Sequence, residues 1–373
     1  MHKIMTPGPT QVAPNVLQAR SLPCTNPDLD VAFVEDYKQL CLKISALLKT
    51  EAETLILGGE GILGLEAACA SLTEEGDRVL VIDNGVFGRG FQDFVSMYGG
   101  VPVLFTGDYR ETIDVAALKA FLEGDSDFKY ATVVHGDTPS GMLNDVGAIT
   151  KLLKEYGILT VVDAVSTMFG EALDVSNIDI LCGGSQKVIS APPGLTINVV
   201  SDDAKAAINA RQTPIRSFYA NLKVFFNYYE EKWFPYTMPI SDINGLRVAI
   251  ENIEADGEIY ERHARIAKAT RAAIVASGLK LYANSGYSNT VSVFEVPAGT
   301  TAEAILETMK NEHNIMIAGS FDVFAGKIIR IGHMGNNSSV ENVAETLDAL
   351  DKTFAALGVE LKASLAEVFE ANL

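Results

Sequence analysis

The sequence predicts an α/β protein: a mostly parallel sheet flanked by helices, followed by a smaller α+β region. Between residues 54 and 200, short apolar runs alternate with helix-like segments. Several of these runs are continuously apolar, a pattern typical of strands that are covered on both faces. With 373 residues, the chain also exceeds the size at which one hydrophobic core usually keeps growing, so we expect two or three domains.

The first elements are an extended arm and a helix. Residues 6–10 read Thr-Pro-Gly-Pro-Thr, and the two prolines exclude a helix or a central strand there. We therefore expect an arm that covers another part of the protein. From Val34 to Thr50, apolar residues recur at intervals of three and four, which predicts an amphipathic helix.

A short strand at 54–57, a glycine-rich turn at 58–61 and a helix rich in small residues come next. Such a turn places the free N–H groups of a helix N-terminus where an anion, most simply a phosphate, can bind. A purely structural turn explains the pattern equally well, because the spacing matches neither Gly-x-Gly-x-x-Gly nor a Walker A loop.

The following segments complete the predicted sheet. We expect a strand at 78–83, a loop at 84–88 and then alternating helices and strands at 91–97, 101–105, 115–122, 130–135, 149–156, 158–163, 178–182 and 195–200. Ligands of such sheets bind beyond the carboxyl ends of the strands. The loops at those ends carry Phe87, His135, Asp137, Thr138, Asp163 and Lys187.

The C-terminal region predicts the smaller α+β part. A long helical segment runs from Ile240 to Ser277, with Gly257 at mid-length. We expect strands near 279–282, 290–296 and 328–331, and helices near 302–312 and 340–357.

Composition narrows the function classes. A formal net charge of −19 disfavours nucleic acid and anionic membrane surfaces as partners. No apolar run approaches the roughly 18 residues of a membrane span, and prolines interrupt the N-terminus before a signal-peptide core could form. The four cysteines lie far apart, so we expect neither a metal site nor a disulfide framework. These features favour a cytoplasmic enzyme of a reducing compartment.

Two charged residues at strand ends are candidates for chemistry. Lys187 follows a buried strand and two glycines, and is either a solvated surface lysine or a Schiff-base lysine. Asp163 ends another buried strand, where an isolated carboxylate is costly unless it is paired. It is either a helix cap or ion-pair partner, or the carboxylate that keeps a pyridine nitrogen protonated.

An ordered set of motifs across nearly the whole chain resembles the class V aminotransferases, most closely the alanine/serine–glyoxylate transaminases. The motifs are Thr-Pro-Gly-Pro-Thr (6–10), Gly-Gly-Glu-Gly (58–61), Asp-Asn-Gly-Val-Phe-Gly (83–88), His-Gly-Asp-Thr-Pro-Ser-Gly (135–141), Val-Asp-Ala-Val (162–165), Gly-Ser-Gln-Lys (184–187), Pro-Pro-Gly (192–194) and Arg-Ile-Gly (330–332). The resemblance implies fold type I of the pyridoxal-phosphate-dependent transferases, with a mostly parallel seven-stranded sheet in the large domain. It also implies a large domain at 20–245, a small α+β domain formed by 1–19 and 246–373, and a homodimer with shared active sites.

The resemblance also implies pyridoxal 5′-phosphate as the cofactor. Lys187 would form a Schiff base with it and move the proton between substrate and cofactor, and Asp163 would pair with the pyridine nitrogen. Phe87 would stack on the ring and Thr138 would donate to the ring oxygen. The phosphate and the rest of the cofactor would be met by Glu60, Gly61, Ile62, Val165, Gln186 and, from the partner subunit, Thr237. Arg330 would bind the substrate carboxylate, near Gly8 and Asn26, and no metal is implied.

This sequence departs from the family pattern at three places. Glu60 stands where a small hydroxyl residue is usual, and a carboxylate beside a phosphate dianion is repulsive unless it points away. Phe234 stands where a tyrosine is frequent, and Thr25-Asn26 replaces a His-Arg or similar pair. These departures leave the substrate open.

The resemblance therefore predicts a transaminase that moves an amino group from a small amino acid, of the alanine or serine type, to glyoxylate or pyruvate by a ping-pong route. A 2-aminoethylphosphonate–pyruvate transaminase is an alternative, although few basic residues in the loops suggest a phosphonate pocket. Cysteine desulfurase chemistry is disfavoured because no cysteine follows Cys182. A hypothesis from another functional class is a catalytically silent relative that acts as a binding module. The joint presence of Lys187, Asp163 and Arg330 argues against it.

Overall fold

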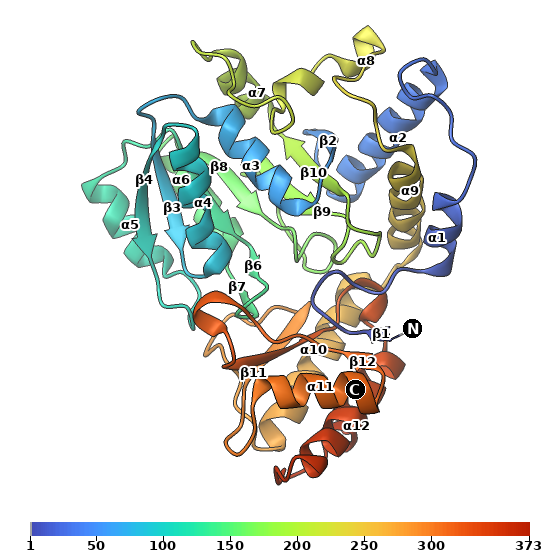
Figure 1. The fold of residues 1–373 in the computed structure, drawn as a ribbon. Coiled ribbons are helices and arrows are strands. Elements are labelled where there is room, and N and C mark those ends of the chain that lie inside the picture. The colour runs from blue at the N-terminus through green and yellow to red at the C-terminus, as the bar shows by residue number, and fades with distance from the viewer. Residues whose placement is uncertain (1) are drawn as a thin grey trace.

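The computed structural model describes residues 2–373, which form a broad upper part built on a large sheet and a narrower lower part (Figure 1). The large sheet has seven strands in the order β2-β10-β9-β8-β5-β3-β4. All neighbours are parallel except β10, which is antiparallel to β2 and to β9. The strands are β2 (Glu53–Gly58), β3 (Arg78–Asp83), β4 (Val101–Thr106), β5 (Tyr130–Val134), β8 (Leu159–Asp163), β9 (Ile180–Gly184) and β10 (Leu195–Val200). The predicted α/β class with a mostly parallel seven-stranded sheet is confirmed.

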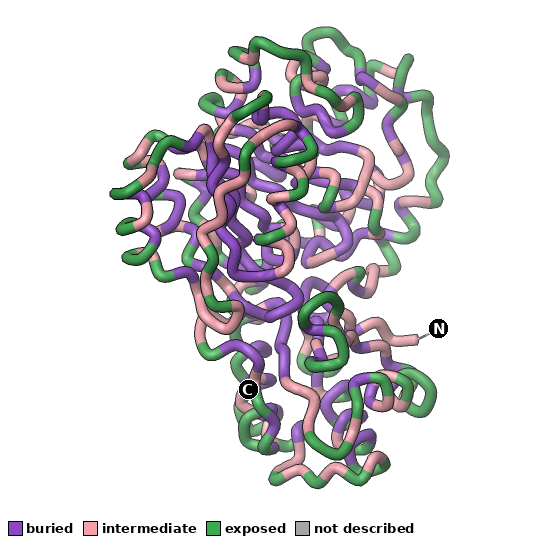
Figure 2. The backbone as a smooth tube through the Cα atoms, turned by 60° about the vertical axis from the view of Figure 1, so that its left-hand side comes forward, coloured by how far each residue is buried: buried purple, intermediate pink, exposed green. Residues whose placement is uncertain are grey.

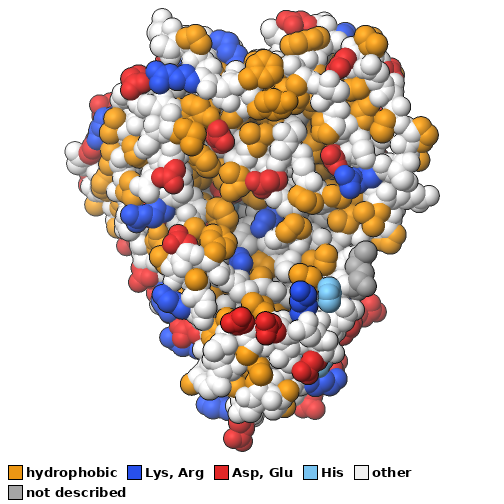
Figure 3. Space-filling model, in the orientation of Figure 1, with side chains coloured by type: hydrophobic (Ala, Val, Ile, Leu, Met, Phe, Trp, Pro, Cys, Tyr) orange, Lys and Arg blue, Asp and Glu red, His pale blue; other side chains and the backbone are white. Residues whose placement is uncertain are grey.

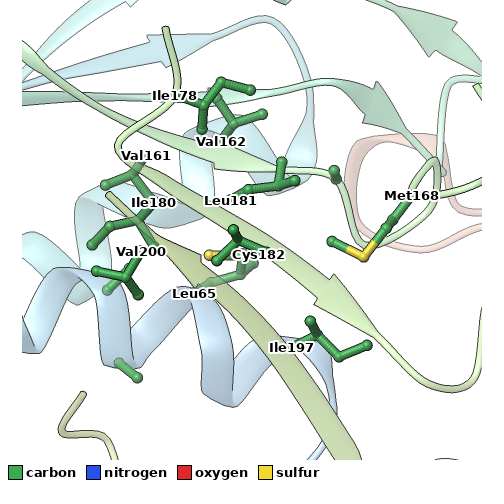
Figure 4. Close-up of a cluster of buried hydrophobic side chains, with 14 of the residues drawn as sticks. Leu65, Val161, Val162, Met168, Ile178, Ile180, Leu181, Cys182, Ile197 and Val200 are labelled. Carbon is green, nitrogen blue, oxygen red and sulfur yellow. The ribbon is translucent and has the colours of Figure 1, made fainter. Parts of the chain in front are cut away.

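Continuous burial explains why these strands lack an alternating pattern. Every residue of β5, β9 and β10 is buried, and the interior of the upper part is correspondingly almost all buried backbone (Figure 2). Figure 4 shows the packing between β8, β9, β10 and α3, where Val161, Leu181, Val200 and Leu65 contribute apolar side chains. The helices of this part are α2 (Val31–Leu47), α3 (Gly61–Leu72), α4 (Val86–Met97), α5 (Val115–Gly124), α6 (Val146–Glu155) and α7 (Asp202–Asn209).

One local prediction in the upper part is wrong. Residues 84–88 were expected to form a loop, but α4 begins at Val86, so Phe87 lies in its first turn. The helix can start this close to β3 because Gly88 has no side chain: a Cβ there would lie 2.8 Å from the carbonyl oxygen of Ile82.

The lower part combines two small strand pairs with helices around a second apolar cluster. β1 (Lys3–Ile4) pairs in parallel with β12 (Ile315–Met316), and β11 (Val291–Glu295) pairs antiparallel with β13 (Ile328–Gly332). The helices are α10 (Ile259–Ala276), α11 (Ala302–Glu312), α12 (Val340–Ala356) and α13 (Leu365–Ala371). Their buried residues form a cluster separate from the core of the large sheet.

The strand expected at 279–282 is absent; Leu281 makes only an isolated bridge to Phe294. The backbone of residues 280 and 282 bonds to β11, but the pairing stops there because the following residues bond to the upper part. The N–H of Asn284 donates to the carbonyl of Arg110 (2.8 Å), and the carbonyl of Gly286 accepts from Leu143 (2.5 Å).

The helical segment expected from Ile240 to Ser277 is two helices, α9 (Ile240–Ala255) and α10, separated by a turn that contains Gly257. α9 packs against α1 (Pro14–Arg20), and Val16 of α1 belongs to the large core. We propose the domain division 20–245 against 1–19 plus 246–373, with both α1 and α9 crossing the boundary.

The remaining elements are short: the hairpin β6 (Gly136–Asp137) and β7 (Met142–Leu143), α8 (Tyr228–Glu231), and three 3₁₀ turns at Lys223–Phe225, Asp322–Phe324 and Gly335–Asn337. Across residues 2–373, none of the helices has both the length and the apolar character needed to cross a membrane.

Candidate active site

A cavity of about 280 Å³ lies beside the carboxyl ends of β8 and β9, where the N-terminal arm and the lower part meet the large sheet. Figure 3 shows basic side chains among apolar ones in the middle of this face, between the broad and narrow parts. The cavity is lined by Pro7, Gly8, Pro9, Glu60, Ile62, Leu65, Phe87, Gly136, Thr138, Asp163, Val165, Ser166, Gln186, Lys187, Phe321 and Arg330.

Lys187 follows β9 and is held under the N-terminal arm. Its Nζ donates to the carbonyl of Pro7 (2.7 Å). Thr10 fixes the arm over the lysine, because its Oγ1 donates to the Lys187 carbonyl (2.9 Å) and its N–H donates to the Gln186 carbonyl (3.0 Å). Burial lowers the pKa of Lys187 to about 8, and the positive charge of Arg330 acts in the same direction. Lys187 is therefore a buried amine that is partly neutral near neutral pH.

Asp163 ends β8 and is 5% exposed. Its Oδ1 accepts a hydrogen bond from the N–H of Val165 (2.9 Å). Burial raises its pKa to about 7, although the Val165 N–H and the Lys187 charge favour the carboxylate. A carboxyl group in such surroundings gains strongly from a cationic N–H partner that enters the cavity.

The glycine-rich turn brings Glu60, Gly61 and Ile62 to the N-terminus of α3. The Glu60 carboxylate caps this helix, because its Oε1 accepts from the N–H of Ile62 (3.1 Å). Its Oε2 accepts from Nε2 of Gln186 (2.9 Å). Gly61 must be a glycine, since a Cβ there would lie 2.8 Å from the Val165 side chain.

Arg330 enters the cavity from β13 of the lower part. Its Nε donates to the carbonyl of Gly319 (2.6 Å), and Nη1 lies 3.5 Å from the carbonyl of Thr138. Two of the five guanidinium N–H groups are used in this way, which leaves donors for a carboxylate. Burial lowers the pKa of Arg330 to about 10, while Asp137 opposes this shift. The ring of Phe321 lies 5.9 Å from the guanidinium and 6.1 Å from the ring of Phe87.

Comparison with known proteins shows which family contains this chain. The model of the aminotransferase class-V family matches residues 25–343. This chain is a class V aminotransferase.

Relatives of the aminotransferase match along most of their length. A pyridoxamine–pyruvate transaminase from Mesorhizobium japonicum is 33% identical, over 96% of this chain and 92% of the relative. An alanine–glyoxylate aminotransferase from Callithrix jacchus is 29% identical over 93% and 86%. The solved structure of a ureidoglycine–glyoxylate aminotransferase from Bacillus subtilis superimposes with a TM-score of 0.95, at 28% identity, over 100% of this chain and 97% of the other.

Family membership implies pyridoxal 5′-phosphate as the cofactor of this class V aminotransferase. The pyridine-ring end of the cavity fits it: Lys187 supplies the amine for the aldehyde, and Asp163 a buried partner for the ring nitrogen. The phosphate end does not fit in this arrangement, because the Glu60 carboxylate already accepts from Ile62 and Gln186. No group of three or more His, Cys, Asp or Glu side chains suited to a metal occurs within residues 2–373.

Three predicted site residues of the aminotransferase are not among the residues that line the cavity in the single chain: Gly61, which lies between the lining residues Glu60 and Ile62 in sequence, Thr237 and Asn26. Thr237 is exposed, and its Oγ1 donates to Oδ2 of Asp28 (2.9 Å). Asn26 is also exposed, and its Oδ1 accepts from the N–H of Asp28 (3.0 Å). Their roles stay predictions.

Two strand-end candidates of the predicted sheet, His135 and Asp137, do not line the cavity. His135 is buried with its Nδ1 2.9 Å from Oγ1 of Thr167, and burial lowers its pKa to about 4. Asp137 accepts from the Ser140 hydroxyl (2.7 Å) and does not line the cavity.

Sequence reasoning about the aminotransferase missed Phe321, whose side chain closes the cavity between Phe87 and Arg330. It lies in a loop with no motif, so only the fold brings it there. Pro7 and Pro9 could have been named, because they belong to the arm expected to cover another part of the protein.

Proposed function

We propose that this aminotransferase, which moves an amino group between an amino acid and a 2-oxo acid, takes a small donor of the alanine or serine type and glyoxylate or pyruvate as acceptor, by a ping-pong route. One observation carries the proposal: a buried amine of lowered pKa, Lys187, shares a cavity with the guanidinium of Arg330. Lysine is suited to proton transfer at a substrate α-carbon, and arginine to a carboxylate.

Different residues of the chain would hold the ring, move the proton and bind the substrate. A pyridoxal ring supplies an aldehyde, which condenses with amines, and also a pyridinium, which withdraws electrons. Lys187 would hold the ring through its Nζ and, once displaced by the substrate amine, carry the proton on and off the α-carbon. Asp163 would keep the ring nitrogen protonated, Thr138 would contact the ring oxygen, and Val165 and Phe87 would bound its faces. Arg330 would fix the substrate carboxylate, and the arm around Gly8 would exclude water.

Cavity size and charge support a small substrate. A ring and its substrate would share about 280 Å³, with Phe321 at the wall beside Arg330. Among the described residues that line the cavity, the basic ones are Lys187 and Arg330, and both already have assigned roles. A phosphonate dianion would need a further cation, so the 2-aminoethylphosphonate alternative is not favoured.

We also propose a homodimer in which Thr237 of one subunit reaches the other's site. Large apolar side chains near this residue are exposed in the single chain: Phe218 is 58% and Trp233 53% exposed. Such exposure is typical of interaction surfaces. We further propose a reducing, cytoplasmic location, which is supported by four cysteines that are all free thiols.

The test is spectroscopic. Purified protein given excess pyridoxal 5′-phosphate or pyridoxal should develop the absorbance of a lysine-linked ring, and Lys187→Ala should not. Adding alanine or serine should then bleach this band, and glyoxylate or pyruvate should restore it. If the wild-type protein stays colourless with both ring compounds, the proposed transaminase activity is contradicted. If neither alanine nor serine changes the band, the proposed class of amino donor is contradicted.

A further inference from the structure

The phosphate end of the cavity already contains an anion. Two donors assigned there to the cofactor phosphate, the N–H of Ile62 and Nε2 of Gln186, both point to the Glu60 carboxylate, at 3.1 and 2.9 Å. The next N–H of the helix, on Leu63, donates to the Glu60 carbonyl (2.9 Å). Glu60 therefore already occupies two of the N–H groups that make the N-terminus of α3 an anion site, those of Ile62 and Leu63.

Within residues 2–373, no cationic side chain lines the phosphate end of the cavity to balance a second anion beside Glu60. The charged side chains that line the cavity are Glu60, Asp163, Lys187 and Arg330. Arg330 is held at the other end by Gly319 and Thr138, and Lys187 by Pro7. A phosphate dianion beside Glu60 would thus meet a like charge, and such repulsion is strong where water is excluded.

The hydroxyl expected from the partner subunit is also engaged with a carboxylate. Thr237 Oγ1 donates its single proton to Oδ2 of Asp28 (2.9 Å). A neighbour that presents this segment would therefore bring an acidic group together with the hydroxyl. This second observation is independent of Glu60 and disfavours phosphate in the same way.

Glu60 suits an alcohol instead. An ionised carboxylate accepts about four hydrogen bonds, and Ile62 and Gln186 supply two. A ring compound that carries a hydroxymethyl group in place of the phosphate ester can donate its O–H to the remaining sites. The same side chain thus attracts one form of the ring and repels the other, which is how specificity usually arises.

We propose that this site takes the unphosphorylated ring compounds pyridoxamine and pyridoxal, which enter and leave as substrates. The inference rests on the proposed function, because it uses the same half-reaction at Lys187 and Arg330. The amino group leaves the ring's aminomethyl carbon for the carbonyl carbon of the 2-oxo acid, and the oxo oxygen ends in the ring aldehyde by way of water. The aminomethyl carbon is oxidised by two electrons and the keto carbon is reduced by two, so pyridoxamine and pyruvate give pyridoxal and alanine without another reactant.

A binding titration tests the preference. Protein freed of ring compounds is titrated with pyridoxal and, separately, with pyridoxal 5′-phosphate, and the lysine-linked absorbance gives a Kd for each. We expect the wild type to bind pyridoxal more tightly. Glu60→Ser removes the charge and the hydrogen-bond acceptor, and should shift the ratio of the two Kd values toward the phosphorylated ring by about a hundredfold. Glu123→Ser removes the same charge on exposed α5 and should leave the ratio unchanged.

Turnover provides the second measurement. With pyridoxamine and pyruvate in large excess over wild-type protein, free pyridoxal and alanine should accumulate in equal amounts over many cycles. The proposal is overturned if the wild type binds pyridoxal 5′-phosphate at least as tightly as pyridoxal and retains it through desalting. Amino-acid bleaching of that bound ring would then leave the proposed function standing. If Lys187 captures neither ring compound, both inferences fail. The wild-type ratio decides the preference even where Glu60→Ser does not fold.

Discussion

At the scale of single residues, the site depends on opposing effects on two buried charges. Burial lowers the pKa of Lys187 and raises that of Asp163, so each group is shifted toward its neutral form. Their mutual attraction opposes both shifts. A neutral amine is the nucleophile that condenses with an aldehyde, so the position of Lys187 in the cavity determines its reactivity.

The pKa of Lys187 predicts a pH dependence. Below about pH 8 the amine is protonated and does not attack, so the second-order rate of pyridoxal capture should rise with pH and level off above about pH 8. Because Arg330 lowers this pKa, Arg330→Gln should move the midpoint to higher pH, whereas Arg216→Gln on the exposed surface should not. Stopped-flow absorbance across the pH range measures both. A midpoint near the ordinary lysine value of about 10.4 would contradict the buried-amine interpretation.

At the scale of elements, the N-terminal arm fixes the amine. Gly8 has a φ of +97°, a conformation that favours glycine, and a Cβ there would lie 2.2 Å from Cδ of Lys187. Thr10 then ties the arm to the loop that carries the lysine. The arm and this loop are far apart in sequence and function as one unit.

Gly8→Ala should therefore impair capture of the ring without unfolding the protein. The new methyl group must displace either the arm or the lysine, and strain of this kind weakens binding by about tenfold or more. Absorbance titration gives the Kd, and thermal unfolding checks the fold. Gly90→Ala on α4 is the matched control, because a Cβ there has no atom within 4 Å. Equal affinity of Gly8→Ala and wild type would show that the close contact at Gly8 is not needed.

Sequence reasoning succeeded where local chemistry determines the structure. Continuous apolar runs predict buried strands because both faces of the sheet are covered, and the glycines before Lys187 mark a strand end. It failed where distant parts of the chain decide. The segment at 279–282 makes only a bridge to the small sheet because residues 284 and 286 bond to the upper part, and Phe321 reaches the cavity only through the fold.

The Glu60 turn lies between these cases. The sequence marks the carboxylate as an unusual residue for a phosphate site. Its hydrogen bond from the Ile62 N–H is a local helix cap, whereas its bond from Gln186 depends on how β9 is placed beside α3, which no local pattern specifies. The same limit applies to Arg330, whose motif names the residue but not its distance from Thr138.

At the scale of the whole molecule, a single chain leaves apolar surface exposed beside the segment that carries Thr237. Apolar side chains gather on the upper part of the face shown in Figure 3. Phe218 and Trp233 are more than half exposed despite their size, and Phe234, directly after Trp233, is buried in an aromatic cluster with Tyr37 and Tyr228. The segment is thus packed into the core on one side and apolar on the other, as is typical of an interface.

The proposed homodimer predicts the effect of a charge on this surface. Trp233→Glu and Phe218→Glu would each place a carboxylate in an apolar interface, where desolvation is costly, and should weaken dimerisation by more than about a hundredfold. Sedimentation velocity over a range of concentrations measures the change. Met97→Glu, at a side chain 62% exposed on α4, should leave the dimer intact. Because Thr237 would then no longer reach a second site, the Trp233→Glu monomer should also bind pyridoxal more weakly. A wild-type protein that sediments as a monomer, or a variant that remains dimeric, contradicts shared sites.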